Sequence, residues 1–487
     1  MSTTSLRPTS WISGPDAAND ELAKVLAALP AQLKIERDFP PAAQAEADAA
    51  AQAALAPDFW SALPDRTDIE FVTIDPVGSN DLDQALQLMR EGAGYRFWYA
   101  IADVPAFVTP GGALDAEAHR RGQTLYAADG RIPLHPTVLS EGAASLLEGQ
   151  LRGAFVWEFA LDANADVTSS TVARGQVRSR RRLDYEGVQA QLDAGTADET
   201  LKLLKEVGLA RLVLERARGG ASLNIPEVLI DKVDGRYIAS RRTQLPVENW
   251  NAELSLLTGM EAASIMLAGN IGILRTMPDA DPESIDRFRH QTNALGHPWP
   301  TGEAYGDYLA TLDGSNPKHL AILHAASSLF RGAGYTPFDG APPANTMQAA
   351  VGAPYAHVTA PLRRLVDRFG LVICEALAAK TAVPEWARTA LPELPVEMAR
   401  SNNVAGQLDH RSLDAVEAAV LAPRIGEIFD GVIIAQNKSG SVVQLLDPAV
   451  TAECSGHQKN GTALKVKLVQ ADVATSTILF EAAGSAA

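Results

Sequence analysis

Apolar and polar residues alternate over short runs between residues 69 and 177, and this two-residue period is the pattern of β-strands. Turn-forming residues, such as the Gly-Ser-Asn at positions 78–80, separate one run from the next. We therefore expect a sheet to be built from this part of the chain. The expected strands are Ile69–Asp75, Gln84–Met89, Tyr95–Asp103, Ala154–Leu161 and Val167–Val177.

Beyond Tyr185 the apolar residues recur every three or four positions instead, which is the spacing of amphipathic helices. The expected helices are Ala197–Arg218, Ala252–Arg275, Pro282–Leu295, Pro317–Phe330, Thr359–Ala379 and Glu397–Ala422. Strands that come first and helices that follow are typical of an α+β domain, and we assign residues 41–422 to it.

The two ends of the chain differ from this central part. Residues 1–40 contain one helical pattern, Glu21–Leu33, and an alanine-rich second one, Pro41–Leu55, follows. We expect a short helical element at 1–40, either a helix-turn-helix-like unit or a scaffold or linker. The tail, 423–487, has short strand patterns with glycine-bearing turns, which predicts a small all-β barrel of the OB type, a fold often used on single strands.

The composition is that of a soluble globular protein. The chain has 487 residues, of which 46% are apolar and 21% charged, and this excludes a wholly disordered or fibrous chain. Its length is enough for two to four domains of roughly 100–200 residues. The formal net charge of −17 argues weakly against a nucleic-acid partner, although net charge does not fix the sign of a local cleft.

The two cysteines, Cys374 and Cys454, lie far apart and belong to no CxxC or CxxH arrangement, so neither a zinc ribbon nor a disulfide framework is expected. The first residues lack a basic segment followed by an apolar run, and no apolar stretch is long enough to span a bilayer. We therefore expect a cytoplasmic protein without membrane contact.

The segment TIDPVGSNDLDQAL, residues 73–86, carries three aspartates around a turn. Asp75 ends an apolar strand. Asp81 and Asp83 follow the turn two positions apart, so they project to one side of an extended chain while Leu82 faces the core. Converging carboxylates repel one another unless a cation lies between them, and hard oxygen ligands suit Mg²⁺ or Mn²⁺. The alternative is that the aspartates only form turns at the surface.

Other common catalytic motifs are missing from the sequence. It contains no phosphate-binding GxxxxGK[ST] loop, no GxSxG nucleophile turn and no HExxH pair. Metal-assisted hydrolysis therefore ranks above kinase, serine-hydrolase and zinc-protease chemistry. A carboxylate-bound metal can activate water and neutralise charge on a phosphoryl oxygen, which points to phosphodiester cleavage.

A second cluster of charge lies in YAHVTAPLRRLVDR, residues 355–368. With Thr359 as N-cap, Arg363 and Arg364 fall in the first turn of a predicted helix, where backbone N–H groups and guanidinium groups together favour a phosphate. The alternative is a structural ion pair between Arg363 and Asp367, one helical turn apart. This segment alone does not decide between the two.

Together these two segments resemble the RNB catalytic domain of the ribonuclease II family, in which similar acidic and arginine-bearing segments build one active site. Further similar stretches lie between them, namely YAIADVPAFV, AHRRGQTLY, RIPLHPTVLSEGAASL and VRSRRRLDYEGV. The tail resembles the S1-type OB domain that ends these enzymes. Residues 1–40 are too few for the cold-shock-type domains that usually begin them.

The resemblance implies a large mixed RNB-type catalytic domain, an S1-type barrel, and processive 3′→5′ hydrolysis of single-stranded RNA to nucleoside 5′-monophosphates. It implies Mg²⁺ as the cofactor, with Mn²⁺ as an alternative. The expected partner is the 3′ end of single-stranded RNA, and a monomer with no obligatory protein partner is expected. The rival hypotheses are a catalytically silent RNA-binding protein and a hydrolase of another phosphodiester, such as DNA.

The resemblance also assigns roles to single residues. Asp75 and Asp81 match acidic positions of the family that hold metal, and Asp83, also assigned to the metal, matches the acidic position most essential for turnover. Arg363 matches the arginine at the scissile phosphate. Tyr126 matches an aromatic residue that stacks on the terminal base, for which core packing is the alternative role.

Two further arginines are assigned to substrate binding. Arg364 follows Arg363, and Arg182 belongs to a basic run that is either a set of RNA backbone contacts or a solvated surface. One position departs from the family, because Gln84 stands where a fourth acidic residue is usual. Its amide oxygen can ligate a metal but brings no charge, so we expect weaker metal binding or better tolerance of Mn²⁺.

Overall fold

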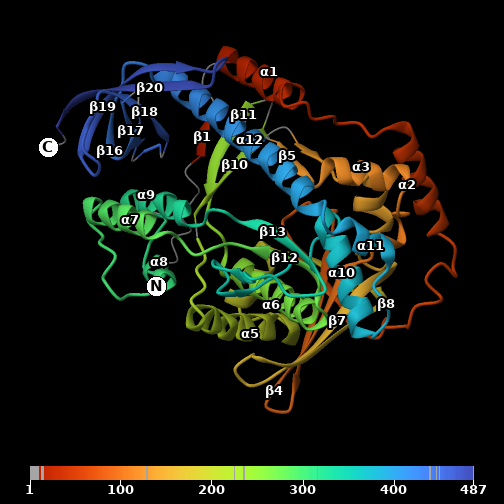
Figure 1. Cartoon of the computed structure of the whole chain (residues 1–487). Helices are drawn as coiled ribbons and strands as arrows, with labels where there is room; N and C mark the ends of the chain where they lie inside the picture. Colours follow the sequence, from red (N-terminus) through yellow and green to blue (C-terminus); the bar gives the residue numbers. More distant parts are fainter. Residues whose placement is uncertain are drawn as a thin grey trace.

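The computed structural model describes residues 10–12, 16–127, 130–223, 225–233, 236–314, 316–437, 440–445, 447–448 and 450–485. The chain forms a large unit of helices and strands and a closed barrel, and one long helix, α12 (Leu394–Leu421), leads from the first to the second (Figure 1). The expected α+β class and the all-β barrel in the tail are both confirmed.

The centre of the large unit is a six-stranded sheet with the strand order β8-β7-β4-β3-β2-β9. Neighbouring strands pair antiparallel except β2 and β9, which run parallel. The strands are β2 (Val72–Asp75), β3 (Gln84–Glu91), β4 (Gly94–Ala102), β7 (Leu151–Leu161), β8 (Val167–Arg178) and β9 (Arg181–Asp184). The five strands expected from the alternating runs are thus present, and β9 adds a sixth.

Both faces of this sheet are buried. On β4, Phe97, Tyr99 and Ile101 belong to one apolar core, whereas Ala100 and Ala102 belong to another on the opposite face. Most helical residues of the first core come from α4 (Tyr185–Asp193), α5 (Glu199–Ala217), α6 (Pro246–Gly269) and α10 (Leu365–Ala378). The second core includes residues of α2 (Pro41–Ala53) and α3 (Ala113–Arg121). Burial on both faces fixes the loops at the ends of the strands.

One expected helix is too long. The pattern predicts a helix over Ala252–Arg275, but α6 ends at Gly269, and β12 (Ile271–Thr276) pairs with β13 (Gly334–Asp339). Asn270 ends the helix in the left-handed conformation, with φ 57°, which Asn adopts more readily than most residues. The prediction is wrong after this residue because a short apolar run does not distinguish a helix from a buried strand.

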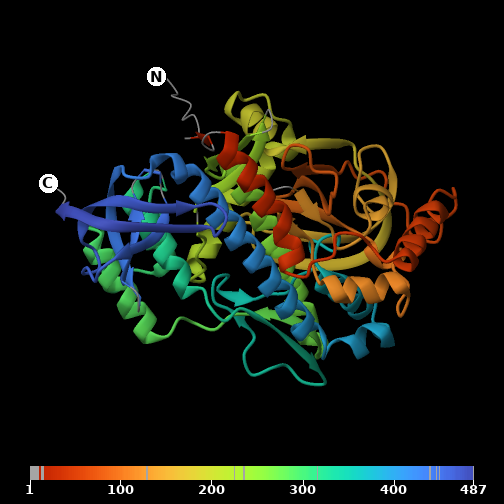
Figure 2. The ribbon, with the colours of Figure 1, turned by 90° about the horizontal axis from the view of Figure 1, so that it is seen from above.

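The N-terminal part contains the helix expected at Glu21–Leu33. Its described residues hold a short strand, β1 (Ser10–Ile12), and one helix, α1 (Asp16–Gln32), which lies along α12 (Figure 2). Leu22, Leu26 and Leu29 of α1 pack into an apolar cluster with residues of α12. The described residues of 1–40 therefore form no helix-turn-helix, and α1 packs along α12 instead.

The tail forms a closed barrel with the order β16-β17-β18-β20-β19. Its strands are β16 (Ile428–Gln436), β17 (Gly440–Leu445), β18 (Thr451–Ser455), β19 (Ala463–Asp472) and β20 (Thr477–Ser485). Helices α7 (Pro282–Ala294) and α9 (Pro317–Ala326) lie next to the barrel (Figure 1), and Gln291 of α7 donates a 3.1 Å hydrogen bond to the Ile434 carbonyl. The barrel is therefore packed on the large unit as well as joined to it.

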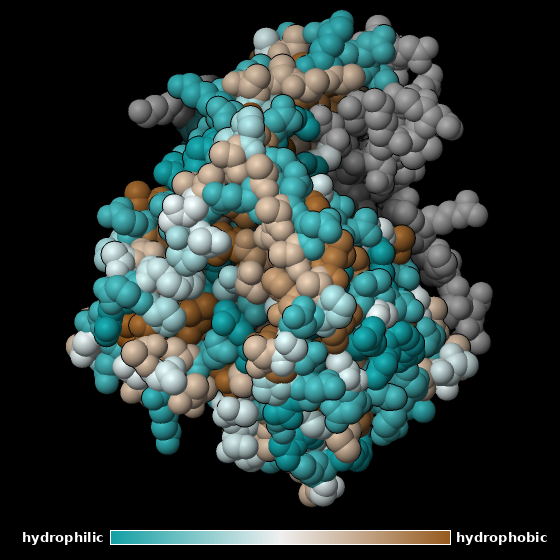
Figure 3. Space-filling model, turned by 90° about the vertical axis from the view of Figure 1, so that its right-hand side faces the viewer, coloured by the Kyte–Doolittle hydropathy of each residue, from teal (hydrophilic) through white to brown (hydrophobic). Residues whose placement is uncertain are grey.

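The remaining elements are short. They are β5 (Leu125–Ala127), β6 (Gly130–Ile132), β10 (Glu227–Val233), β11 (Arg236–Arg242), β14 (Met347–Gln348), β15 (Ala353–Pro354), α8 (Tyr305–Ala310) and α11 (Glu385–Ala390). Within the described part of the chain, no helix is both long and apolar enough to cross a bilayer. Figure 3 shows a face on which hydrophilic residues predominate and hydrophobic ones gather in small groups.

Candidate active site

The loop between β2 and β3 carries the three aspartates that were predicted to form the site. Asp75 ends β2, and Asp81 and Asp83 lie in non-helical backbone just before β3. Leu82 between them is buried in an apolar core, and its N–H donates a 3.0 Å hydrogen bond to the Ser145 hydroxyl. The prediction that Leu82 faces the core is therefore confirmed, and this anchor fixes the backbone of the aspartates on either side.

Asp83 is buried at the base of the site. One of its carboxylate oxygens accepts the Leu362 N–H over 2.7 Å, and the other lies 3.7 Å from Nε of Arg363. Burial raises the pKa of Asp83 well above its ordinary value, and the Arg363 guanidinium acts in the opposite direction. The Arg363 side chain is 44% exposed, so it can meet a ligand while it remains beside the buried carboxylate.

Asp75 is the second perturbed carboxylate. Its Oδ2 atom is buried and has no hydrogen-bond partner. Burial and the charge of Asp81 raise the pKa of Asp75 to about 7, while Arg363 and Arg182 lower it. A buried oxygen without a partner costs free energy until a ligand meets it, and such perturbed groups gather at functional sites.

Asp81 is paired with a residue that sequence reasoning did not single out. Nη1 of Arg131, on β6, lies 2.5 Å from Oδ1 of Asp81, and Nη2 of the same guanidinium lies 2.7 Å from Oε1 of Glu141. Arg131 also pairs in register with Tyr126 across the β5–β6 hairpin. The stretch RIPLHP was noticed only as a family resemblance, and nothing in its local pattern indicates that its arginine reaches Asp81.

Asp75 and Asp81 fit a hard divalent cation, Mg²⁺ or Mn²⁺, because their charges repel and one Asp75 oxygen has no other partner. Asp83 is less suited, since its oxygens already face Leu362 and Arg363. Across the described residues, no group of three or more His, Cys, Asp or Glu side chains lies in a metal-holding arrangement. The charge of Asp81 nevertheless raises the pKa of both Asp75 and Asp83, so the three carboxylates lie close enough to interact, and their joint binding of a metal stays a prediction.

Gln84 does not take the place of a fourth metal ligand. Its amide nitrogen donates a 2.7 Å hydrogen bond to the Thr359 carbonyl, and its amide oxygen accepts a hydrogen bond from the Tyr99 hydroxyl. Both ends of the amide are occupied within the protein in this structure, and the expected weaker metal binding or better tolerance of Mn²⁺ stays a prediction. Gln84 instead ties β3 to the segment that carries Arg363.

The arginine segment folds differently from the prediction. Helix α10 begins at Leu365, so Arg363 and Arg364 precede the helix rather than lie in its first turn. Asp367 explains the late start, because its carboxylate accepts the Ala360 N–H over 2.7 Å and thereby holds the preceding turn. The alternative ion pair is also shifted by one residue, since Arg364, and not Arg363, pairs with Asp367.

Arg364 makes two hydrogen bonds to Asp367, each 2.9 Å long, and only 17% of its side chain is exposed. This bidentate arrangement satisfies both groups and favours a structural role. The assignment of Arg364 to substrate binding remains a prediction, although the guanidinium also borders the pocket described next.

An open pocket of about 320 Å³ lies in front of Arg363. We call it the tyrosine pocket, because Tyr126 stands on its wall and is 56% exposed, which rules out the alternative of core packing. Its lining residues are Gln123, Thr124, Tyr126, Arg363, Arg364, Ala405, Gly406 and Asp409. The pocket thus joins the predicted stacking residue to the predicted phosphate-binding arginine.

Arg182 lies at the edge of the acidic loop. It is exposed on β9, opposite Thr73 of β2, and its guanidinium donates a 3.1 Å hydrogen bond to the Asn80 side chain. The rest of the basic run is bound to protein groups: Arg178 donates to the Gly149 carbonyl, Arg180 to the Thr67 carbonyl and Arg181 to Asp198. RNA contact through Arg182 therefore stays a prediction, and its place beside Asp75 is compatible with it.

Family models match both parts of the chain. The model of the RNB domain matches residues 64–377, which contain the sheet, the acidic loop and the Arg363 turn. The chain belongs to the RNB family. The model of the RNase II-type exonuclease C-terminal S1 domain matches residues 427–483 of this RNB protein, which form the closed barrel.

Relatives and solved structures agree with this membership. Ribonuclease R of Thermotoga maritima is 25% identical over 417 residues, which cover 80% of this chain and 57% of the relative. The chain spans about half the length of the Ribonuclease R relatives it matches. The apo form of Mycoplasma genitalium RNase R has a TM-score of 0.84 at 18% identity, over 95% of this chain and 78% of that one.

The solved structures with this fold also include a pseudonuclease. Yeast Ssd1, a pseudonuclease, has a TM-score of 0.67 at 16% identity, over 85% of this RNB protein and 52% of the yeast chain. At such identities the structural matches show a shared fold and no more. Activity has to be argued from the residues of the site.

Proposed function

We propose that this RNB protein is a metal-dependent 3′→5′ exoribonuclease that hydrolyses single-stranded RNA to nucleoside 5′-monophosphates. The observation that carries the proposal is the buried Asp83 beside the half-exposed Arg363, next to the unpartnered oxygen of Asp75. A site that combines carboxylates fit for a cation with an accessible guanidinium is suited to a phosphodiester, whose charge grows as the bond breaks.

In the proposed reaction water attacks the phosphorus of the last phosphodiester bond and the P–O3′ bond breaks. The shortened RNA keeps a 3′-hydroxyl, and the terminal nucleotide leaves with its 5′-phosphate. Bound Mg²⁺ or Mn²⁺ supplies charge neutralisation and a more acidic water, with Asp75 and Asp81 as the residues that would hold it. Arg363 binds the scissile phosphate, and the Leu362 N–H keeps the Asp83 carboxylate in place beside it.

The tyrosine pocket supports the assignment of a terminal nucleotide. Stacking of a base on the exposed Tyr126 ring contributes about 1–3 kcal/mol and does not depend on which base is present, as an exonuclease that reads any sequence requires. The Mycoplasma genitalium relative has been solved with ribose-methylated single-stranded RNA and with double-stranded RNA. We extend RNA binding to this chain as part of the proposal.

A catalytically silent RNA-binding protein is the second candidate, because a pseudonuclease shares this fold. The presence of Asp75, Asp81, Asp83 and Arg363 argues for an active site instead. A hydrolase of DNA keeps the same chemistry with a different ligand. Competition between RNA and DNA oligonucleotides of equal sequence separates that third candidate from the first.

A time course with a 5′-labelled single-stranded RNA tests the proposal, with Mg²⁺, Mn²⁺ or a chelator added and products resolved to one nucleotide. We expect a metal-dependent ladder that shortens from the 3′ end and releases nucleoside 5′-monophosphates. Intact RNA under every metal, with binding retained in a parallel shift assay, would establish the silent binder. Cleavage within the RNA would contradict the exonuclease.

The proposal extends to how and where the enzyme works. We infer processive action by a monomer in the cytoplasm, without an obligatory protein partner. Dilution of a running reaction into excess unlabelled RNA tests processivity, because a processive enzyme finishes the labelled molecules already bound. Sedimentation of the purified chain tests the monomer.

A further inference from the structure

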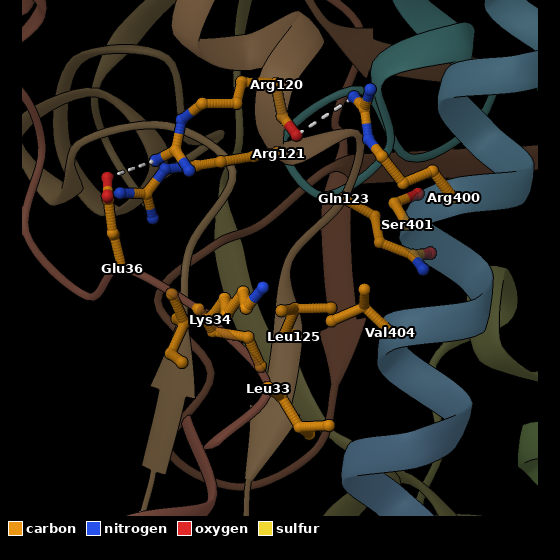
Figure 4. A pocket seen from close by; sticks show the side chains of 12 residues that line it. Leu33, Lys34, Glu36, Arg120, Arg121, Gln123, Leu125, Arg400, Ser401 and Val404 are labelled. Carbon is orange, nitrogen blue, oxygen red and sulfur yellow. Dashed lines mark hydrogen bonds and ion pairs between the residues drawn. The ribbon is translucent and has the colours of Figure 1, made fainter. Parts of the chain in front are cut away.

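A second cavity, of about 290 Å³, lies behind the β5–β6 hairpin (Figure 4). Leu125 and Ile132 of the hairpin line this cavity, which we call the hairpin pocket. Their neighbours in sequence, Tyr126 and Arg131, belong to the candidate active site, because successive side chains of a strand point to opposite faces. The hairpin is therefore a thin wall with one pocket on each side.

The hairpin pocket has two chemically different ends. Figure 4 shows Arg120 and Arg400 near one end and the aliphatic side chains of Leu33, Leu125 and Val404 near the other. Its volume is close to the lower limit of small-molecule pockets, which is about 300 Å³. Such a pocket suits a small ligand with a charged group at one end and an apolar body at the other.

The charged end is cationic and not fully neutralised. The side chains of Lys34, Arg120, Arg121 and Arg400 all line the pocket, and the carboxylates in contact with them are Glu36 and Glu117. Arg400 donates hydrogen bonds to the carbonyls of His119 and Arg120 and has no carboxylate partner among the described residues. Excess positive charge at one place is notable in a chain of formal net charge −17, and it favours an anionic ligand.

Lys34 is the most available of these cations. It is exposed, it lies just after α1 in a left-handed backbone conformation with φ 58°, and its ammonium forms no ion pair within the described part of the chain. Figure 4 shows its side chain extending into the pocket beside Leu125. The ammonium lies beside Leu125 and across the pocket from Arg120 and Arg400 (Figure 4), so a phosphate bound between them can meet it while the ligand body rests on Leu33 and Val404.

We propose that the hairpin pocket binds a phosphate monoester carried on a flat, partly apolar body, and that a nucleoside 5′-monophosphate is such a ligand. The cationic end takes the phosphate and the aliphatic end takes the base. The choice of a mononucleotide rests on the proposed function, because it is the product of that reaction. A ligand there touches the back of the strands that carry Tyr126 and Arg131, so its binding also restrains both residues.

Calorimetric titration of the whole chain with AMP tests this proposal, in chelator and without RNA, so that its outcome does not depend on catalysis. We expect saturable binding of AMP at the hairpin pocket, with a loss in affinity of at least about tenfold in Lys34→Glu. Lys24→Glu is the matched control, because Lys24 is an exposed lysine of α1 that does not line the pocket. A second variant, Val404→Phe, fills the aliphatic end and is expected to weaken AMP binding as well.

Three further titrations make the result decisive: two with other ligands and one with another variant. Inorganic phosphate and adenosine are each expected to bind more weakly than AMP, because each occupies one end of the pocket. Arg363→Ala weakens any AMP binding in the tyrosine pocket, and in this variant the AMP binding that depends on Lys34 is expected to remain, because Arg363 does not line the hairpin pocket. The proposal is overturned if AMP does not bind at millimolar concentration, if Lys34→Glu and Val404→Phe leave binding unchanged, or if Arg363→Ala abolishes it. Phosphate that binds as tightly as AMP also overturns the assignment of the aliphatic end.

Discussion

Arg363 and Arg364 are neighbours in the chain, yet each meets an aspartate in a different way. Arg364 makes two hydrogen bonds of 2.9 Å with Asp367, and both side chains are withdrawn from water. Arg363 stays half exposed, and its Nε atom lies 3.7 Å from Asp83. The first pair is closed and can hold the segment together, whereas the second is open and leaves hydrogen-bonding capacity for a ligand.

The two pairs separate structural from functional charges in the site. A closed pair satisfies its own donors and acceptors, so a ligand has little to gain from it. The open pair lies beside Asp75, which has a buried oxygen without a partner, and it borders the tyrosine pocket. Openness together with a neighbouring cavity is therefore the feature that marks Arg363 and Asp83 as candidates for catalysis.

The largest effect is expected from Asp83→Asn, which removes the charge of the open pair and keeps its shape. The asparagine oxygen can still accept the Leu362 N–H, so the fold and RNA binding should persist. Turnover should fall by roughly 10²–10⁴, the range for losing a positioned acid–base or electrostatic group. Single-turnover cleavage and a shift assay measure the two quantities. Equal loss of both would assign Asp83 to folding.

The second prediction compares alanine substitutions of Arg363 and Arg364. Arg363→Ala should lower kcat by roughly 10²–10³ with little change in unfolding free energy, because the side chain is half exposed and its pair is open. Arg364→Ala should cost about 3–5 kcal/mol of stability, because it leaves the buried Asp367 unpaired. Denaturant unfolding and turnover per folded molecule separate the two effects. Similar profiles for both variants would break the comparison.

Much of this could be predicted from the sequence, because it depends on local patterns. Alternation around Leu82 places the loop of Asp81 and Asp83 correctly, and the short strand patterns predict the barrel. The exposure of Tyr126 agrees with its predicted stacking role, although its contact with RNA stays a prediction. Each of these features depends on residues that are close together in the sequence, so it can be predicted without knowing which distant segments are in contact.

The errors arise where distant segments decide the outcome. Thr359 looks like a helix start, but the distant Asp83 accepts the Leu362 N–H, Asp367 of the same segment accepts the Ala360 N–H, and a turn forms instead. Gln84 looks like a metal ligand until its amide is seen to bind other parts of the chain. In each case a hydrogen bond to a residue far away in the sequence overrides what the local sequence favours. A single sequence does not show which distant residue will make that hydrogen bond.

A smaller effect is expected at Arg131, which closes one side of the acidic loop through Asp81 and Glu141. Its positive charge competes with a divalent cation for Asp81. We therefore expect Arg131→Ala to bind Mn²⁺ several-fold more tightly in the absence of RNA, measured by electron paramagnetic resonance, and to need less metal for half-maximal turnover. Arg90→Ala, an exposed paired arginine, is the control. Weaker Mn²⁺ binding would show that Arg131 orients Asp81 for the metal instead.

The smallest effect is expected at Glu253, and it tests whether an open ion pair outside the tyrosine pocket also marks a functional residue. Glu253 is buried, its Oε2 has no hydrogen-bond partner, and Nη2 of Arg218 is 4.0 Å away. Burial and the charge of Glu215 raise the pKa of Glu253 from 4.5 to about 7, while Arg218 and Arg211 lower it. The pair is open like that of Asp83, but Glu253 lines a separate cavity of about 330 Å³ and neither the tyrosine pocket nor the hairpin pocket.

A carboxyl group whose pKa is raised by folding holds its proton more tightly in the folded state, so its ionisation destabilises the fold. This cost is absent below pH 4.5, grows as the pH rises towards 7, and stays constant above that. Glu253→Gln should therefore melt a few degrees above the unsubstituted protein at pH values well above 7 and level with it near pH 4.5. Thermal melts across this range measure the difference, and turnover per folded molecule should not change. A loss of turnover would mean that an open pair beside a cavity is enough to mark a residue of the active site, even where that cavity contains neither Arg363 nor Tyr126.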